Sequence, residues 1–514
     1  MNKQPSIWLR RATSGALGLK CSDVDSGEKM AKKHRIKVNF IYQLAYQILL
    51  VILPLVTAPY IARVLGPENN GIYTYTHAIV NYFVVFAALG IEAYGNRLIA
   101  QSKNKDRQTL NKAFSSVFWM HFIVACAAAL VYFVYVTVIA SRYRQIAVIQ
   151  GIWVLASIID INWLFFGLEE FKLTVTRNTI IKLVTVFCIF SFVRTRDQLW
   201  LYTLIMGMGT FLSNAVLWGF ARKYVLFTRV TFREIIVHFK PLVILFLAVI
   251  ATSIYRMIDK VMLGWYSDMS NLGSYEYADR MIKLVITLIT ALGTVMLPRM
   301  SALYAEGKDE QAARYMNSTS QFMFVMAFAL AFGLAGIADE FMPTLLGPGY
   351  EGSVILTKVL CISLPIMGWN NLVRTQVLMP KEKDRVYIVA VWAGAIVNII
   401  LNYLFIHWYG PIGAAIATVA AYAVVGVFQT YPLKKELPVA SYLKYVFIPL
   451  ISGVIMYVCV RAVSRVLKPG IAGIAVEILT GAVIYLAINL VYLMRSKNEV
   501  FEDVLQKYKK KLHK

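Results

Sequence analysis

Charged residues interrupt two neighbouring apolar stretches near the middle of this sequence. They are Arg256, Asp259 and Lys260 in the first stretch, and Asp279, Arg280 and Lys283 in the second. Within each stretch the spacing places the three residues on one face of a helix. A charge at membrane depth costs at least about 2.5–3.5 kcal/mol, so it normally faces a partner or a water-filled cavity.

These six residues comprise four cations and two carboxylates. Complete pairing would leave a surplus of about two positive charges, which predicts a cavity that binds an anion such as a phosphate or an acidic sugar. The alternative is that the two carboxylates pair with the two arginines between helices. Lys260 and Lys283 would then extend toward the membrane surface without binding a substrate.

Other polar residues in apolar stretches extend this candidate site. The cationic cavity is expected to include Lys182 and Arg374 as well, and contacts to sugar hydroxyls are expected from Asn370, Asn371, Asn398 and Asn402. Asp259 and Asp279 are expected to act as charge partners, and acids that could couple transport to an ion are Glu92, Asp160 and Glu477. We expect His77 and His121 to be satisfied within the helical bundle.

Motifs for catalysis and cofactor binding are missing from the sequence. It contains no phosphate-binding glycine loop, zinc-ligand spacing or nucleophile elbow. The five cysteines form no disulfide or metal-binding pattern. We therefore predict a protein that is not an enzyme and that needs neither a metal nor a cofactor.

The composition indicates which elements must position these residues. Of 514 residues, 59% are hydrophobic and only 16% are charged, and the mean hydropathy is +0.61. Apolar runs of about twenty residues predict about fourteen transmembrane helices in an all-α integral membrane protein. The net charge of +24 would suggest nucleic acid in a soluble protein. Here the basic residues fall between apolar runs, which favours a membrane protein with both termini in the cytoplasm.

Two segments about two hundred residues apart resemble each other. Val64–Gly66, Gly71–Tyr75 and Ala88–Gly90 have counterparts in Met262–Gly264, Gly273–Tyr277 and Ala291–Gly293. An internal repeat of hydrophobic helices predicts two pseudo-symmetric six-helix lobes with a substrate site between them. The predicted divisions are a disordered cytoplasmic leader (1–35), a first lobe (36–220), an amphipathic cytoplasmic linker (221–240), a second lobe (241–432), two additional transmembrane helices (433–494) and a basic amphipathic tail (495–514). The linker could equally be an ordinary basic cytoplasmic loop.

Several motifs resemble bacterial polysaccharide flippases of the Wzx type. They are Ala62–Glu68, Gly71–Tyr73, Ile258–Gly264, Ser274–Ala278 and Ala291–Arg299. These flippases share a superfamily with the MATE multidrug exporters and the lipid II flippase, and the likeness spans about residues 36–495. The resemblance implies a V-shaped, MATE-like transporter in the bacterial cytoplasmic membrane. It would move an undecaprenyl-diphosphate-linked oligosaccharide to the outer leaflet by alternating access, for surface polysaccharide biosynthesis.

The partners that this interpretation implies are the lipid-linked oligosaccharide, membrane lipids and the polysaccharide polymerase machinery, with no nucleic acid and a monomeric carrier. The alternatives are a multidrug or cation antiporter, or a lipid II flippase, of the same superfamily. The basic residues and the absence of a carboxylate in the first helix argue against a cation exporter. A membrane glycosyltransferase or polymerase is disfavoured because the sequence has no long external loop or soluble domain.

Overall fold

The computed structural model describes residues 21–140, 142–434, 436–437, 439–468 and 470–496. Residues 1–20 of the predicted leader and 497–514 of the predicted tail lie outside this part. The described residues form helices and connecting turns without a β-strand. The predicted all-α membrane fold is therefore confirmed. α2 begins at Cys21, within the range predicted as a disordered leader.

The first half of the chain contains α2 (Cys21–Ala88), α3 (Ile91–Ser102), α4 (Arg107–Val138), α5 (Arg144–Ile158), α6 (Asn162–Gly167), α7 (Phe171–Phe192), η1 (Arg196–Gln198), α8 (Leu199–Ala221), α9 (Phe232–Ile236) and α10 (Phe239–Tyr266). The second half contains α11 (Met269–Ala305), α12 (Asp309–Leu346), α13 (Gly352–Cys361), α14 (Ser363–Val373), the π-helical turn η2 (Arg374–Leu378), α15 (Asp384–Thr430), η3 (Tyr431–Leu433), α16 (Val439–Ser464) and α17 (Ile471–Arg495).

Ten of the described helices are long and apolar enough to cross a membrane, or up to twelve when each of two bent pairs counts as one span. α2 and α15 each continue through a glycine with non-helical torsion angles, Gly66 (φ 76°) and Gly410 (φ 54°). A proline follows each glycine, and this pair of residues turns the chain without a side-chain clash. The predicted number of fourteen spans is not confirmed and stays a prediction.

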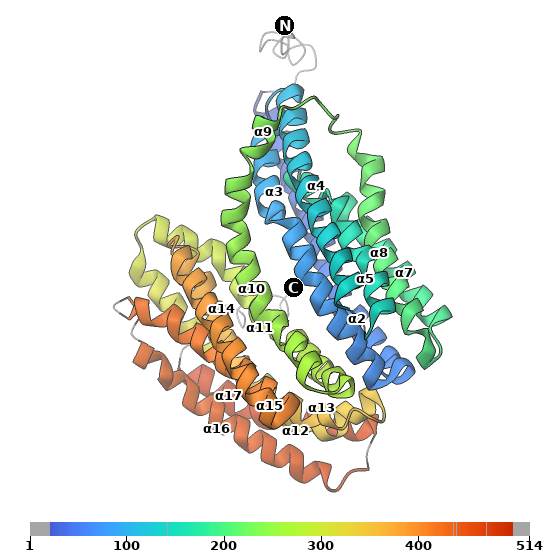
Figure 1. The fold of residues 1–514 in the computed structure, drawn as a ribbon. Helices are drawn as coiled ribbons and strands as arrows, with labels where there is room; N and C mark the ends of the chain where they lie inside the picture. The colour runs from blue at the N-terminus through green and yellow to red at the C-terminus, as the bar shows by residue number, and fades with distance from the viewer. Residues whose placement is uncertain (1–20, 141, 435, 438, 469, 497–514) are drawn as a thin grey trace.

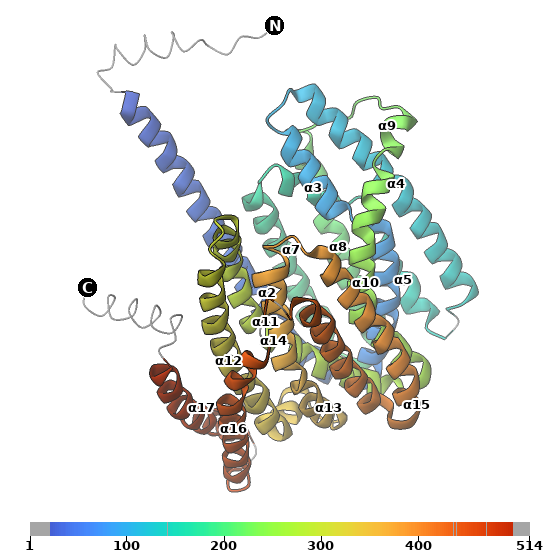
Figure 2. The ribbon, with the colours of Figure 1, turned by 90° about the vertical axis from the view of Figure 1, so that its left-hand side faces the viewer.

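The helices form two groups (Figure 1). Helices α2 to α8 make up the first group and helices α11 to α15 the second, while α16 and α17 pack against α12 on the outside of the second. α11 packs along α2, and α10 contacts both α2 and α15, so these helices connect the two groups. Figure 2 shows the beginning of α2 projecting beyond the other helices.

The segment between α8 and α10 packs against α4. The amide of Leu226 donates to Asn111 Oδ1 and that of Thr228 to Ser115 Oγ, both at 2.9 Å. Phe227 stacks on Trp218. The helical part, α9, is only five residues long. This connection is therefore held by contacts to the first group of helices.

Loops in the second group are joined by ion pairs. Lys381 Nζ lies 2.9 Å from Glu436 Oε2, and Lys383 also pairs with Glu436. The hydrogen bonds from Lys383 and Lys381 hold the pKa of Glu436 below its ordinary value. The segments that follow η2 and α15 are tied together in this way.

The contact between α2 and α11 depends on two glycines from the repeated motifs. A Cβ atom on Gly71 would lie 1.8 Å from the carbonyl oxygen of Met269, and one on Gly273 would lie 2.1 Å from that of Pro67. Each repeat therefore presses a glycine against the backbone of the other, as small residues allow at membrane helix contacts.

A buried polar cluster lies beside these glycines. Asn70 Nδ2 donates to Tyr350 Oη at 2.9 Å, and Tyr277 Oη donates to Asn70 Oδ1 at 3.2 Å. The rings of Tyr277 and Tyr350 pack edge to face with their centroids 5.2 Å apart. Together the two glycines and this cluster fill the space between the two groups of helices where α2 packs against α11.

We predict that Gly71→Ala disrupts this contact, because the added methyl group cannot fit without displacing the backbone of α11. The expected loss in the free energy of unfolding is about 1–3 kcal/mol, as for overpacked interiors, measured by denaturant unfolding of the purified protein. Gly219→Ala is the matched control, since a Cβ at that helical position meets nothing within 4 Å. Equal stability of the two variants would contradict the prediction.

Candidate functional site

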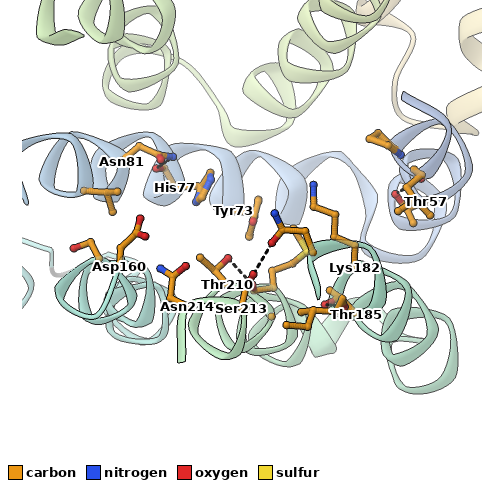
Figure 3. A pocket seen from close by; sticks show the side chains of 18 of the residues that line it. Thr57, Tyr73, His77, Asn81, Asp160, Lys182, Thr185, Thr210, Ser213 and Asn214 are labelled. Atoms are coloured by element: carbon orange, nitrogen blue, oxygen red, sulfur yellow. Dashed lines mark hydrogen bonds between the residues drawn. The ribbon is translucent and has the colours of Figure 1, made fainter. Parts of the chain in front are cut away.

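A cavity of about 880 Å³ opens among α2, α7, α8, α10 and α11 (Figure 3). Its described lining residues run from Leu53 to Leu284, so it is enclosed by the first group of helices together with α10 and α11. This volume lies within the range of ligand-binding pockets. Five cations line it, against three carboxylates. The cations are Arg177, Lys182, Lys260, Arg280 and Lys283, and the carboxylates are Glu92, Asp160 and Glu276.

The charged residues of α10 and α11 form one connected cluster. Lys260 pairs with Glu276 and lies 3.0 Å from Asp279 Oδ2. Arg280 contacts the other oxygen of Glu276 at 3.1 Å, and Lys283 contacts Asp279 at 2.6 Å. The side chains of Lys260, Glu276 and Asp279 are each at most 15% exposed. Because the lysine and both acids each touch two opposite charges, the cluster joins α10 to α11.

The predicted surplus of two positive charges on these helices is wrong in its simple form. Glu276 adds a third carboxylate to the cluster, and Arg256 is exposed and does not line the cavity. The predicted arginine pairs, Arg256 with Asp279 and Asp259 with Arg280, do not form either. Arg280 pairs with Glu276 instead, one helical turn away.

The cluster is asymmetric toward the cavity. Lys260, Arg280, Lys283 and Glu276 line it, whereas Asp259 and Asp279 do not. Asp259 is 4% exposed and accepts a hydrogen bond from Tyr275 Oη at 2.5 Å. Three cations and one acid therefore face the cavity from this side, and two acids lie behind them.

The opposite wall contains a network centred on Arg177. This buried guanidinium donates to Asn162 Oδ1 at 2.9 Å, to Asn178 Oδ1 at 2.7 Å and to the carbonyl of Ser213. Ser213 Oγ in turn donates to Asn178 Oδ1 at 2.9 Å. Lys182, one turn beyond Asn178, lines the same wall as predicted for a cavity residue (Figure 3). The predicted site residues do not include Arg177.

The helix is broken between α5 and α6, at Asp160. Side chains donate hydrogen bonds to backbone carbonyls around this break, where the regular helical hydrogen bonding stops. These bonds are His121 to Ser157, Asn214 to Ala156, Trp218 to Ile159 and Trp163 to Asp160, at 2.7–3.2 Å. The bond to Ser157 holds His121 Nε2, but Nδ1 of His121 and Nδ1 of His77 have no hydrogen-bond partner among the described residues, so the prediction that both rings are satisfied is not confirmed. Both His77 and His121 also line the cavity.

The remaining predicted residues lie away from this cavity. Arg374 stacks over the Tyr387 ring at 4.4 Å. Asn370 donates to the carbonyl of Tyr422, and Asn402 donates to Asn398. Gly293 packs directly against Asn371. The four predicted sugar contacts are therefore packing groups of the second group of helices in this structure.

The acids predicted for ion coupling lie in different places. Glu92 and Asp160 line the cavity. Glu477 is buried on α17, far along the chain from the lining residues, and its Oε2 has no hydrogen-bond partner. Among the described residues, no three His, Cys, Asp or Glu side chains gather to hold a metal ion.

Family comparison agrees with this architecture. The model of the family described as polysaccharide biosynthesis protein matches residues 36–304, more than half of the chain. The chain belongs to this family. A second family model, MatE, matches residues 245–404. The predicted membership in the superfamily of Wzx-type flippases is thereby confirmed.

Relatives of this family member include a protein of Escherichia coli (strain K12) named "Putative O-antigen transporter". It is 24% identical over 409 residues, which cover 76% of this chain and 95% of the relative. The fold is similar to that of the lipid II flippase MurJ in an inward closed conformation, with a TM-score of 0.73, 16% identity and coverage of 89% and 99% of the two chains. An inward-facing MATE multidrug transporter has a TM-score of 0.55, 14% identity and coverage of 75% and 94%.

We predict that Glu276→Gln strongly destabilises this family member. The substitution leaves Arg280 without its carboxylate and weakens the hold on Lys260, and breaking a buried ion pair from one side costs about 3–5 kcal/mol. Denaturant unfolding in lipid nanodiscs measures the change. Glu306→Gln removes an acid from the Lys308 pair, in which both side chains are more than half exposed, so it should cost less than about 1 kcal/mol. A loss for Glu276→Gln no larger than that of the control would refute the structural role of the cluster.

Proposed function

We propose that this protein is a flippase that translocates an undecaprenyl-diphosphate-linked oligosaccharide across the bacterial cytoplasmic membrane for surface polysaccharide biosynthesis. Family membership and the O-antigen transporter relative support this class of substrate. The observation that carries the proposal is the charged face of α10 and α11, where Lys260, Arg280, Lys283 and Glu276 line the cavity and the acids Asp259 and Asp279 do not. A diphosphate on this face would meet three cations and one carboxylate, Glu276, which is already paired with Lys260 and Arg280.

Lys283 is the best placed of these cations to bind a phosphate. Its side chain is 34% exposed, and its partner Asp279 also contacts Lys260. Lys283 can therefore turn to a phosphate oxygen without leaving Asp279 unpaired in the membrane. Lysine binds phosphate as a flexible point charge, which suits such an exchange of partners.

Transport by alternating access follows from the two groups of helices. The lipid tail stays in the bilayer while the head group occupies the cavity, and the groups then separate at the end closed by Gly71 and Gly273. The positive-inside rule places both termini in the cytoplasm. The cycle makes and breaks no covalent bond of the substrate, so we assign no catalytic residue. The carrier is proposed to act as a monomer beside the polymerase machinery.

The test is flipping of the lipid-linked repeat unit that accumulates when the chromosomal gene is deleted. We predict that Lys283→Met reduces its translocation in proteoliposomes at least about tenfold, because a charge-assisted hydrogen bond to phosphate is lost, and that Lys283→Arg retains most activity. Arg256→Gln removes a cation that does not line the cavity and should behave as the wild type. Normal flipping by Lys283→Met, or equal loss in Arg256→Gln, would overturn the proposed diphosphate site.

A further inference from the structure

The wall opposite the cations differs from them in its chemistry. It is formed by α2, α7, α8 and the break between α5 and α6, and the polar side chains labelled on it in Figure 3 include Thr57, Asp160, Lys182, Thr185, Thr210 and Ser213. Asp160 and Lys182 are charged and the hydroxyl groups are neutral, so this wall combines one acid, one base and several hydroxyls.

The amide of Asn178 is fixed by its neighbours. Its Oδ1 accepts hydrogen bonds from Arg177 and from Ser213 Oγ. The Nδ2 group is then left as the donor, and it has no acceptor among the described residues. Arg177 thus acts as a positioning residue that orients a hydrogen-bond donor on the cavity wall.

The carboxylate of Asp160 is held in the same way. Its Oδ1 accepts from the backbone amide of Asn162 at 2.8 Å and from Asn162 Nδ2 at 2.6 Å. Asn162 is in turn fixed by Arg177 and by Asn214 Oδ1. Oδ2 of Asp160 has no donor among the described residues, so it is an available acceptor.

The threonines of this wall add further acceptors. Thr57, Thr185 and Thr210 each donate their hydroxyl hydrogen to a carbonyl of their own helix, at 2.9, 2.8 and 3.3 Å. Once that hydrogen is used, the oxygen can only accept a bond from a ligand in the cavity. The wall therefore offers several acceptors and the Asn178 donor.

Phosphate oxygens at neutral pH are acceptors, so they would be repelled by the Asp160 carboxylate and find no donor in the threonine hydroxyls. Sugar hydroxyls both donate and accept, so they match it. A broken helix at membrane depth is also where carriers commonly build a substrate site. We propose that this wall, centred on Asp160 and Asn178, binds the hydroxyl groups of the head-group sugar while the diphosphate lies against α10 and α11.

This inference rests on the proposed flippase function. Binding assays with two lipids, one that carries the sugar and one that lacks it, test the two proposals separately. Wild-type protein in nanodiscs is titrated with the repeat-unit lipid extracted from the deletion strain, and with undecaprenyl diphosphate, which has no sugar. Asp160→Asn and Asn178→Asp each keep the fixed Oδ1 acceptor. The first replaces the other acceptor, Oδ2, by a donor, and the second replaces the donor, Nδ2, by an acceptor. Thr210→Val removes an acceptor at constant shape.

We expect each of these variants to lose about tenfold or more in affinity for the repeat-unit lipid, because a buried hydroxyl is left without its partner. Their affinity for undecaprenyl diphosphate should stay within about twofold of the wild type, which also shows that they are folded. Lys283→Met should weaken both lipids. Asn271→Asp, an exposed amide outside the cavity, should change neither.

If the wild type binds neither lipid, the proposed function fails and the sugar site fails with it. If the wild type binds both lipids but the three wall variants lose neither, or lose both equally, the sugar-binding wall is overturned and the flippase proposal stands.

Discussion

A polar group at membrane depth must find its partner within the protein, and the rest of this structure depends on that constraint. The Lys260 cluster satisfies it on α10 and α11, where Lys260, Glu276 and Asp279 form ion pairs and Asp259 accepts a hydrogen bond from Tyr275. α11 packs along α2, and α10 contacts α2 and α15. The ion pairs therefore stabilise the two helices through which the lobes contact each other.

The same constraint explains the break before Asp160. Freed carbonyl groups would be costly in a bilayer, but side chains from α4, α6 and α8 donate to them. His121 and Trp218 are two of these donors. Once its carbonyls are satisfied, the break can place a carboxylate and an amide on a cavity wall without unfolding the span. The hydrogen bonds that side chains donate to these backbone carbonyls thus permit a polar surface on the cavity wall.

Much of the fold could be predicted from the sequence. Apolar runs and the repeated glycine motifs are local signals, so the helical membrane fold and the correspondence between Gly71 and Gly273 could be recognised without coordinates. The contacts of Glu276 could not be recognised in that way. It lies in a tyrosine-rich motif, and its pairing with Lys260 depends on how α10 and α11 pack. The break at Asp160 involves neither glycine nor proline, and its only local signal is an aspartate that accepts a hydrogen bond from the amide two residues on, which is a weak indicator of a turn. The spacing of Asn398 and Asn402 suggested a ligand site, but two amides one helical turn apart can also hydrogen-bond to each other, and these two do.

The different chemistry of the two cavity walls constrains how a substrate can lie in the cavity. Lys260, Arg280 and Lys283 line it on α10 and α11 together with Glu276, and hydroxyl and carboxylate acceptors line it on α7, α8 and the break at Asp160, beside Lys182. A head group with an anionic end and a hydroxylated end can form favourable contacts with both walls in one orientation only. The reverse orientation would bring phosphate against a carboxylate. Since neither wall alone is specific, selection of the substrate depends on the distance between them, and that distance would change if α2 moved relative to α11 in the proposed transport cycle. Only a ligand that reaches both walls stabilises the conformation in which the walls face each other. Binding of the correct head group would then be coupled to the arrangement of the two groups of helices.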